Sequence, residues 1–378
     1  MKIKKILLSP QEFKESLSGY EVASAMKDGI LRVDPLVNIE ISPVADGGDG
    51  TLKTMVDVTN GNIVEETVEN PLGDQIQAEW GKLGTSQTAV IEMARASGLA
   101  LLKENEKSAL KTTTYGTGQL FKSALDQGIK KFILAIGGSA TNDGGAGFAT
   151  AIGARLLDKN NNAIYPSGEN LSLIEKIDLS NLDQRIKDIE VQVACDVNNP
   201  LCGETGASAI FGPQKGASTN DIDILDRNLL HWSELIRNQM GKDVKDIPGA
   251  GAAGGLGAGL MAFVNAELAL GADIVLNTLD YDKKLKDIDL VIVGEGQTDK
   301  STQYNKSPVA VSTRAKKLGI PVICISGSLG EGYTECSNQG IDSFFSIVNK
   351  PMELEFALNN AYDLISSSTE EIYKTLIL

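Results

Sequence analysis

The chain has 378 residues, of which 42% are hydrophobic and 22% are charged, an ordinary globular composition with room for two domains and a large core. Its 35 basic and 50 acidic side chains give a formal charge of −15, which argues against nucleic acid as a partner because a phosphate backbone needs a positive surface. No apolar run reaches the roughly 18 residues of a membrane span, so no membrane partner is expected.

The N-terminal part of the chain predicts alternating strands and helices. An apolar run at 4–9 indicates a buried strand, and Ser18 followed three residues later by Glu21 has the form of a capping box that opens a helix. A second strand is expected at 38–44 and a second helix at 51–59. This order is typical of the parallel sheet of an α/β domain.

The pattern changes near Asn62, where a second domain is expected to begin. Segments 62–70, 75–83 and 88–94 have the pattern of antiparallel strands. Strands and helices then alternate again toward the C-terminus, as in a parallel sheet. The remaining predicted strands are 130–138, 189–197, 289–296 and 321–328. The remaining predicted helices are one within 112–128 that ends at Gly128, and 146–158, 221–240, 249–264 and 308–319.

Gly-rich loops follow the predicted strands. The loop "AIGGSATNDGGAG" at 135–147 contains five glycines and leads into a predicted helix. Such a loop exposes backbone N–H groups that suit a phosphate or a carboxylate, although glycines also let a helix and a strand pack closely. Because ligands of open α/β sheets bind outside the carboxyl ends of the strands, we expect these loops to converge on one cleft.

Carboxylates also gather at these strand ends. Asp46 and Asp49 flank the glycine pair of "ADGGDG" and could hold a metal ion or a substrate hydroxyl, but aspartates are also ordinary helix caps. Asp196, just past a predicted strand, stands where catalytic or metal-binding carboxylates are common, or simply precedes a turn. Glu295 and Asp299 in "GEGQTD" suit a metal and nucleotide site, or belong to a solvated loop.

Four other features are weaker signals. Lys215 lies between two glycines in "FGPQKGA", where a cation could meet a phosphate, with a surface lysine as the alternative. The segment "GAGAAG" at 249–254 fits GxGxxG but follows no predicted strand, so we reject dinucleotide binding and expect a tightly packed helix. His231 lies in an amphipathic helix, where a packed or surface histidine is expected instead of a catalytic one. The four cysteines lack zinc or disulfide spacing, which indicates a reduced, cytoplasmic compartment.

Taken in order, these motifs resemble those of the bacterial type I glycerate kinases. The resemblance runs from near Ile6 to about Leu329 and continues more loosely beyond. The matching segments are "FKESLS", "ADGGDGT", "NPLG", "IEMARASGLALL", "TTTYGTGQL", "IGGSATNDGGAG", "ACDVNNPLCG", "FGPQKGA", "PGAGAAGGLGAG" and "GEGQTD".

The resemblance implies ATP-dependent phosphorylation of D-glycerate, usually at the 2-hydroxyl, with ATP and Mg²⁺ as cofactors. It also implies an α/β fold of two domains. We place a flavodoxin-like or Rossmann-like domain with a parallel sheet at 1–62 and 286–378, and an inserted mixed-sheet domain at 63–285, with the active site in the cleft between them. The expected partners are the small molecules ATP and D-glycerate, and the expected assembly is a monomer or a homodimer.

Phosphoryl transfer to an alcohol requires donors and cations around the phosphates and a carboxylate to take the hydroxyl proton. Asp196 is our first candidate for the base, and Asp46 and Lys14 are further catalytic candidates. Asp299 and Asp196 are the candidate metal ligands. The residues expected to bind substrate or phosphate are Gly47, Gly48, Thr114, Gly116, Thr117, Gly137, Gly138, Ser139, Thr141, Asn142, Asp143, Lys215 and Glu295.

Two loops depart from the family's pattern. In "PQEFK", Gln11 and Glu12 stand where the family usually has Asp and Ser, and in "ADGGDG", Asp49 stands where Glu is usual. A catalytically weak homologue that binds glycerate or nucleotide as a sensor is therefore the alternative hypothesis. A dehydrogenase would rest only on the rejected GxGxxG segment.

Overall fold

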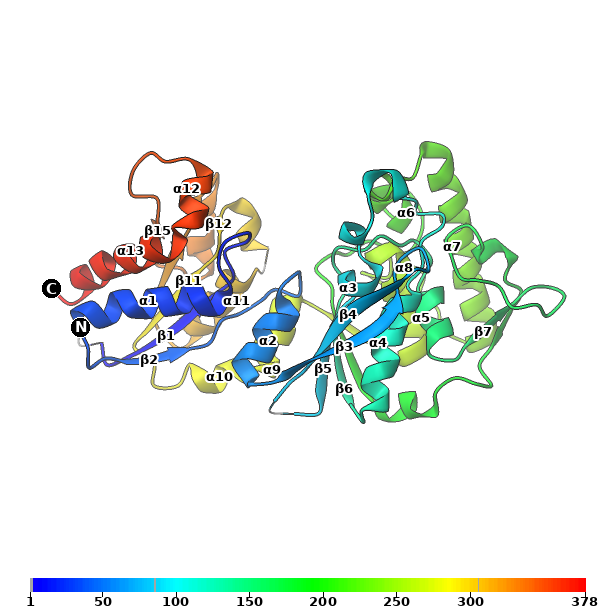
Figure 1. Cartoon of the computed structure of the whole chain (residues 1–378), viewed down its shortest axis with the longest axis horizontal. Coiled ribbons are helices and arrows are strands. Elements are labelled where there is room, and N and C mark those ends of the chain that lie inside the picture. Colours follow the sequence, from blue (N-terminus) through cyan, green and yellow to red (C-terminus); the bar gives the residue numbers. More distant parts are fainter. Residues whose placement is uncertain (1–2, 85, 305) are drawn as a thin grey trace. The chain divides into compact units, whose positions relative to one another are not determined.

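The computed structural model describes residues 3–84, 86–304 and 306–378, which fold into two compact units (Figure 1). The first unit comprises Met1–Asp46, Lys53–Thr59 and Ala272–Leu378, and the second comprises Gly47–Leu52 and Asn60–Gly271. Each unit contains its own sheet and its own apolar core. The predicted α/β class, with one parallel and one mixed sheet, is confirmed.

The sheet of the first unit is entirely parallel, with the strand order β15-β13-β11-β1-β2. Numbered along this unit, the order is 2-1-3-4-5, as in flavodoxin-like sheets. The strand order reverses between β1 and β11, which makes this the switch point of the sheet. Ligands of such sheets bind at the carboxyl ends of the two strands that meet there. The strands are β1 (Lys5–Pro10), β2 (Asn38–Ile41), β11 (Leu290–Gly294), β13 (Val322–Ser326) and β15 (Ser343–Ser346).

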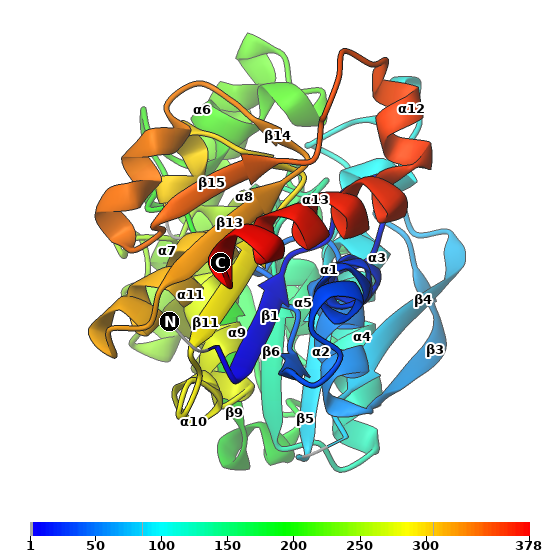
Figure 2. The same cartoon turned by 90° about the vertical axis from the view of Figure 1, so that its left-hand side faces the viewer.

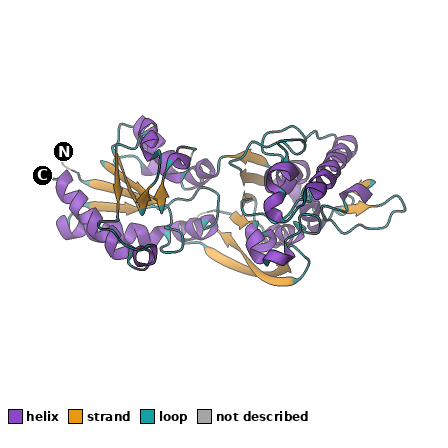
Figure 3. Ribbon diagram, turned by 90° about the horizontal axis from the view of Figure 1, so that it is seen from above, coloured by secondary structure: helices purple, strands orange, loops and turns teal. Residues whose placement is uncertain are grey.

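Helices lie on both sides of this sheet (Figure 3). The expected capping box opens α1, where the Ser18 hydroxyl accepts the N–H of Glu21. Helix α1 packs closely on α13 (Figure 2), since a Cβ added at Gly29 would lie 2.3 Å from the carbonyl oxygen of Ser366. The unit's helices are α1 (Gly19–Val33), α9 (Gly271–Thr278), α10 (Tyr281–Lys284), α11 (Ser307–Lys317), α12 (Leu354–Asn359) and α13 (Ala361–Leu376), and α2 (Thr51–Thr59) is shared with the second unit.

Residues 272–285, which the sequence analysis placed in the inserted segment, belong to the first unit. Tyr281 is buried there and its hydroxyl forms a 2.7 Å hydrogen bond with the Ser9 hydroxyl of β1. The same hydroxyl donates to the backbone carbonyl of Ser42. Because Ser9 and Ser42 are far from Tyr281 in the sequence, no local pattern indicates that this segment belongs to the first unit.

The sheet of the second unit is mixed, with the order β10-β9-β6-β5-β4-β3. Its strands β10, β9, β6 and β5 are parallel, and β4 pairs antiparallel with both β5 and β3. The change of pattern at Asn62 thus marks the antiparallel part of the sheet. The strands are β3 (Asn62–Glu69), β4 (Gln75–Lys82), β5 (Thr88–Glu92), β6 (Lys131–Ala135), β9 (Glu190–Ala194) and β10 (Glu267–Ala269), with a separate pair, β7 (Arg155–Leu157) and β8 (Lys176–Asp178).

The helices of the second unit differ from the prediction at three places. The helix expected at 249–264 begins at Ala252, and Ala253, Gly254 and Gly255 have left-handed backbone angles because this segment is packed closely. Helix α5 ends at Ala151 and residues 155–157 form a strand, because Gly153 reverses the chain with a φ of +107°. Residues 198–218, which show no periodicity, contain the short helix α6. The helices are α3 (Ala94–Ser97), α4 (Tyr115–Asp126), α5 (Ala146–Ala151), α6 (Ala207–Phe211), α7 (Thr219–Met240) and α8 (Ala252–Val264).

Candidate active site

The loop that follows β6 presents a row of backbone donors. Gly137 and Gly138 are exposed, and a Cβ added at Gly137 would meet nothing within 4 Å. The N–H groups of Gly137, Gly138 and Ser139 donate to no acceptor in the part of the chain that the structure describes. Consecutive N–H groups of this kind form a site for an anion.

A buried lysine stands next to this row. The Nζ of Lys215 donates to the Ser139 hydroxyl and to the Thr141 carbonyl, both at 2.7 Å. Burial lowers the pKa of Lys215 to about 7, and the charge of Asp143 partly opposes this change. An anion bound at 137–139 would favour the charged ammonium, so the loop and the lysine are suited to act together.

Asp143 in the same loop bonds to the protein itself. One of its oxygens accepts the N–H and the hydroxyl of Thr114, both at 2.8 Å, and the N–H of Gly147 at 3.1 Å. Burial raises the pKa of Asp143, against the effect of these hydrogen bonds. Asp143 and Thr114 thus join the loop after β6 to the start of α4, and their predicted ligand contacts stay predictions.

Gly116 and Thr117 are also buried in the packing around α4. A Cβ at Gly116 would lie 1.9 Å from the carbonyl oxygen of Glu69, and the Thr117 hydroxyl donates to Ser97 at 2.8 Å. The structure therefore provides a packing reason for both residues. Their predicted contact with phosphate stays a prediction.

Thr141 and Asn142 are buried residues of the loop that follows β6. The Asn142 amide donates to the Ser208 hydroxyl at 2.9 Å, and its buried Oδ1 has no hydrogen-bond partner in the described residues. Gly254, with a φ of +67°, packs so closely that an added Cβ would lie 1.8 Å from the carbonyl oxygen of Thr141. The GxGxxG segment therefore supports this loop by close packing.

Asp196 follows β9 and is exposed. Its Oδ1 accepts the N–H of Gly271 at 3.1 Å, where α9 begins. Gly47 packs against the same place, since a Cβ there would lie 2.5 Å from that of Ala194, and Gly48 adjoins it, half-buried. The structure thus brings Asp196 and Gly47 close together in the second unit.

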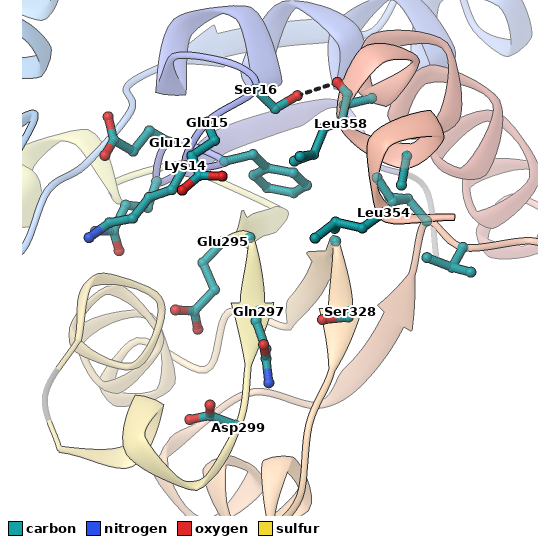
Figure 4. A pocket seen from close by; sticks show the side chains of 18 of the residues that line it. Glu12, Lys14, Glu15, Ser16, Glu295, Gln297, Asp299, Ser328, Leu354 and Leu358 are labelled. Atoms are coloured by element: carbon teal, nitrogen blue, oxygen red, sulfur yellow. Dashed lines mark hydrogen bonds between the residues drawn. The ribbon is translucent and has the colours of Figure 1, made fainter. Parts of the chain in front are cut away.

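A separate cavity of about 500 Å³ lies within the first unit, at the carboxyl ends of β1 and β11. In Figure 4, Lys14, Glu295 and Asp299 line one side, and Leu354 and Leu358 of α12 line the other. The cavity occupies the switch point of the parallel sheet, as expected for a ligand site. Its charged lining residues are Glu12, Lys14, Glu15, Asp46, Glu295, Asp299 and Lys306.

Glu295 is the buried carboxylate of this cavity. Its Oε1 accepts the hydroxyl hydrogens of Thr302 at 2.8 Å and Thr298 at 3.1 Å. Burial raises the pKa of Glu295 to about 7, although the Thr302 hydrogen bond and the charge of Lys306 favour the ionised form. The side chain can therefore exchange a proton near neutral pH.

Gln11, one of the residues that departs from the family's pattern, has a specific partner. Its side-chain amide donates to Asp46 Oδ2 at 3.0 Å, while its buried Oε1 has no hydrogen-bond partner in the described residues. The backbone N–H of Gln11 donates to the Gly294 carbonyl and so extends the pairing of β1 with β11. Glutamine thus supplies Asp46 with a donor, which an aspartate at this position would not.

The candidate metal ligands were Asp299 and Asp196. Asp299 caps a short 3₁₀ helix, Lys300–Gln303, by accepting the N–H and hydroxyl of Ser301, and the Ser301 hydroxyl lowers the pKa of Asp299. Within residues 3–84, 86–304 and 306–378, no three His, Cys, Asp or Glu side chains are grouped to hold a metal ion. Isolated carboxylates remain compatible with Mg²⁺, which keeps several waters and is commonly shared with substrate phosphates.

The predicted site residues do not include Lys306, which lines the cavity, or Thr298 and Thr302, whose hydroxyls donate to Glu295. The signal for the threonines was their spacing, three and seven residues after Glu295. The leucines of α12 carried no signal, because only the tertiary structure brings them to the ends of β1 and β11.

The fold and these two sites define an α/β enzyme with an anion-binding loop and a strand-end cavity. A sequence model described as the glycerate kinase family matches residues 6–377. A glycerate kinase of Halalkalibacterium halodurans is 48% identical over 367 residues, 97% of each chain, and glycerate 2-kinase of Escherichia coli K12 is 46% identical over 374 residues, 99% of this chain and 98% of that one.

The crystal structure of a Salmonella typhimurium LT2 protein designated glycerate kinase 2 is similar throughout. It covers 100% of this chain and 99% of its own, with a TM-score of 0.92 and 44% identity. The chain therefore belongs to the glycerate kinase family and is a kinase. The alternative of a weak sensor is not favoured, and no helix among the described residues is both long enough and apolar enough to cross a membrane.

Proposed function

We propose that this protein transfers the γ-phosphoryl group of ATP to the 2-hydroxyl of D-glycerate and forms 2-phosphoglycerate. The observation that carries the proposal is the row of N–H donors at 137–139 beside the buried ammonium of Lys215. Relatives named glycerate kinase, one of them a glycerate 2-kinase, support the choice of substrate and hydroxyl.

The loop at 137–139 and Lys215 bind phosphoryl oxygens. Phosphoryl transfer depends mainly on positioning and on neutralising charge, so preorganised amides and one cation supply what the reaction requires. Ser139 has two parts in this arrangement, because its N–H is available to a ligand while its hydroxyl accepts the hydrogen bond from Lys215.

Asp196 is the carboxylate that would hold the Mg²⁺ ion used with ATP. The exposed carboxylate is a hard oxygen ligand at the end of a strand, which fits a protein ligand for this ion. When bound, Mg²⁺ neutralises charge on the phosphates. Asp196→Asn should raise the Mg²⁺ concentration needed for half-maximal rate, and Asp299→Asn tests the other predicted ligand.

The first experiment follows ADP release from ATP with D-glycerate, with L-glycerate and without an acceptor, and identifies the product by NMR. Turnover restricted to D-glycerate, with phosphorus on the 2-oxygen, is the expected result. A 3-phosphorylated product would contradict the position, and ATP binding without turnover would contradict the proposed activity.

A further inference from the structure

Resting on the proposed function, we infer that Glu295 is the general base that takes the proton from the glycerate hydroxyl. The sequence favoured Asp196 for this role and gave Glu295 only a binding role. The geometry of the first unit points instead to the carboxylate at the end of β11.

Glu295 directly follows β11 at the switch point of the parallel sheet. The Gln11 N–H donates to the carbonyl of Gly294, which directly precedes Glu295, and so continues the pairing of β1 and β11. The sheet therefore holds the backbone next to Glu295. The side chain is buried, with 6% of its surface exposed, and lines the cavity. A base on a rigid strand end is positioned better than one on a loose loop.

The two carboxylate oxygens of Glu295 have different surroundings. Oε1 accepts both threonine hydroxyls, which fixes the orientation of the group. Oε2 accepts no hydrogen bond from the described residues and is not among the buried atoms that lack a partner. The arrangement leaves Oε2 to accept a proton from a ligand hydroxyl in the cavity.

The charges of the cavity select the ligand that lies there. Five carboxyl side chains and two lysines line it, an excess of negative charge that disfavours a triphosphate. A singly charged hydroxy acid is better suited, with Lys14 or Lys306 as counter-ion for its carboxylate and Glu295 as acceptor for its hydroxyl. The cavity volume of about 500 Å³ is ample for a three-carbon acid.

In the proposed step, the glycerate 2-oxygen forms a bond to the γ-phosphorus of ATP. The bond from that phosphorus to the β,γ-bridging oxygen breaks, and ADP leaves with the electron pair. The hydroxyl proton moves to Glu295 Oε2 and produces a neutral carboxylic acid, which later releases the proton to water. Atoms and charge are conserved with ATP as the only co-substrate.

Several groups act on the protonation of Glu295. Asp299 and Lys306 lie on the segments beside it, and the thiols of Cys324 and Cys336 lie on β13 and the 3₁₀ helix Tyr333–Gln339. Lys14 and Asp46 line the same cavity from the loops after β1 and β2. With a pKa of about 7 for Glu295, kcat/KM for D-glycerate should rise with pH and level off above neutrality.

The test is the pH dependence of kcat/KM for D-glycerate at saturating ATP. Glu295→Gln keeps the side-chain shape and should lower kcat by about 10²- to 10⁴-fold and abolish the rise near pH 7. Its KM for ATP should stay close to that of the wild type. Glu331→Gln, an exposed glutamate of the same unit, is the matched control and should keep the wild-type profile.

A second variant tests the base without removing it. Thr302→Val deletes a hydrogen bond that favours ionised Glu295, so the rise of kcat/KM should move to higher pH while the plateau is largely kept. An unmoved profile in both variants would overturn the inference, as would Glu295→Gln with normal kcat and a raised KM for ATP. Failure of the wild type to phosphorylate D-glycerate would instead refute the proposed function.

Discussion

Lys215 and Ser139 are 76 residues apart in sequence, yet the lysine Nζ donates to the serine hydroxyl at 2.7 Å in a buried setting. The lysine thus lies directly behind the three N–H groups that follow β6. The glycine-rich loop therefore has a buried lysine next to its exposed N–H groups, and the first prediction concerns this lysine.

We expect Lys215→Met to weaken ADP binding by about 10- to 100-fold, since a hydrogen bond to a charged group contributes about 1.5–3 kcal/mol. In the wild type, ADP binding should weaken as pH rises above 7, because the free ammonium loses its proton there. Calorimetric titration at pH 7 and pH 9 checks both effects. Lys111→Met, at an exposed position, serves as the control, and a variant with unchanged affinity and pH response would refute the assignment.

Two glycine substitutions separate the binding part of the loop from its packing. Gly137→Ala adds a methyl group in open space beside the amides and should leave the free energy of unfolding within about 0.5 kcal/mol while raising the KM for ATP. Gly254→Ala forces a Cβ toward the Thr141 carbonyl at a positive φ and should lower the free energy of unfolding by more than about 2 kcal/mol. Urea unfolding and steady-state kinetics measure the two effects, and equal stability losses would contradict this distinction.

The burial of Glu295 predicts a pH-dependent stability difference. Its folded-state pKa of about 7 lies above the ordinary 4.5, so the protein binds more protons folded than unfolded between these values and loses stability as pH rises through 7. Glu295→Gln removes the titration. The free energy of unfolding of the variant minus that of the wild type should therefore increase by about 3 kcal/mol between pH 4 and pH 8. A constant difference, measured by urea unfolding, would show that Glu295 is not a buried titrating group.

The Gln11 amide should contribute to both stability and activity. Gln11→Leu removes the donor to Asp46, which should lower the free energy of unfolding by about 1 kcal/mol and raise the KM for D-glycerate. Gln127→Leu changes an exposed glutamine and provides the comparison. Identical behaviour of the two variants would mean that the contact with Asp46 has no influence on the site.

Local pattern was sufficient for much of the fold. The alternation of strands and helices, the capping box at Ser18 and the loops at strand ends were all predictable, because periodicity and capping depend on neighbouring residues. The helix expected at 146–158 was wrong beyond Ala151, where a left-handed glycine ends it and a short strand follows. The spacing of apolar residues alone does not predict the turn at Gly153 that ends the helix.

The sequence by itself determined the family, the α/β class and the loops that carry the polar side chains, since each is expressed in contiguous residues. Only the tertiary structure decided which of these side chains bond within the protein and which line a cavity. It uses the oxygens of Asp143 within the protein, places Lys215 behind Ser139, and buries Glu295 beside a cavity, with one oxygen held by two threonine hydroxyls. Burial and long-range hydrogen bonds depend on the order of strands in the sheets, and that order sets the charge and proton affinity of each group.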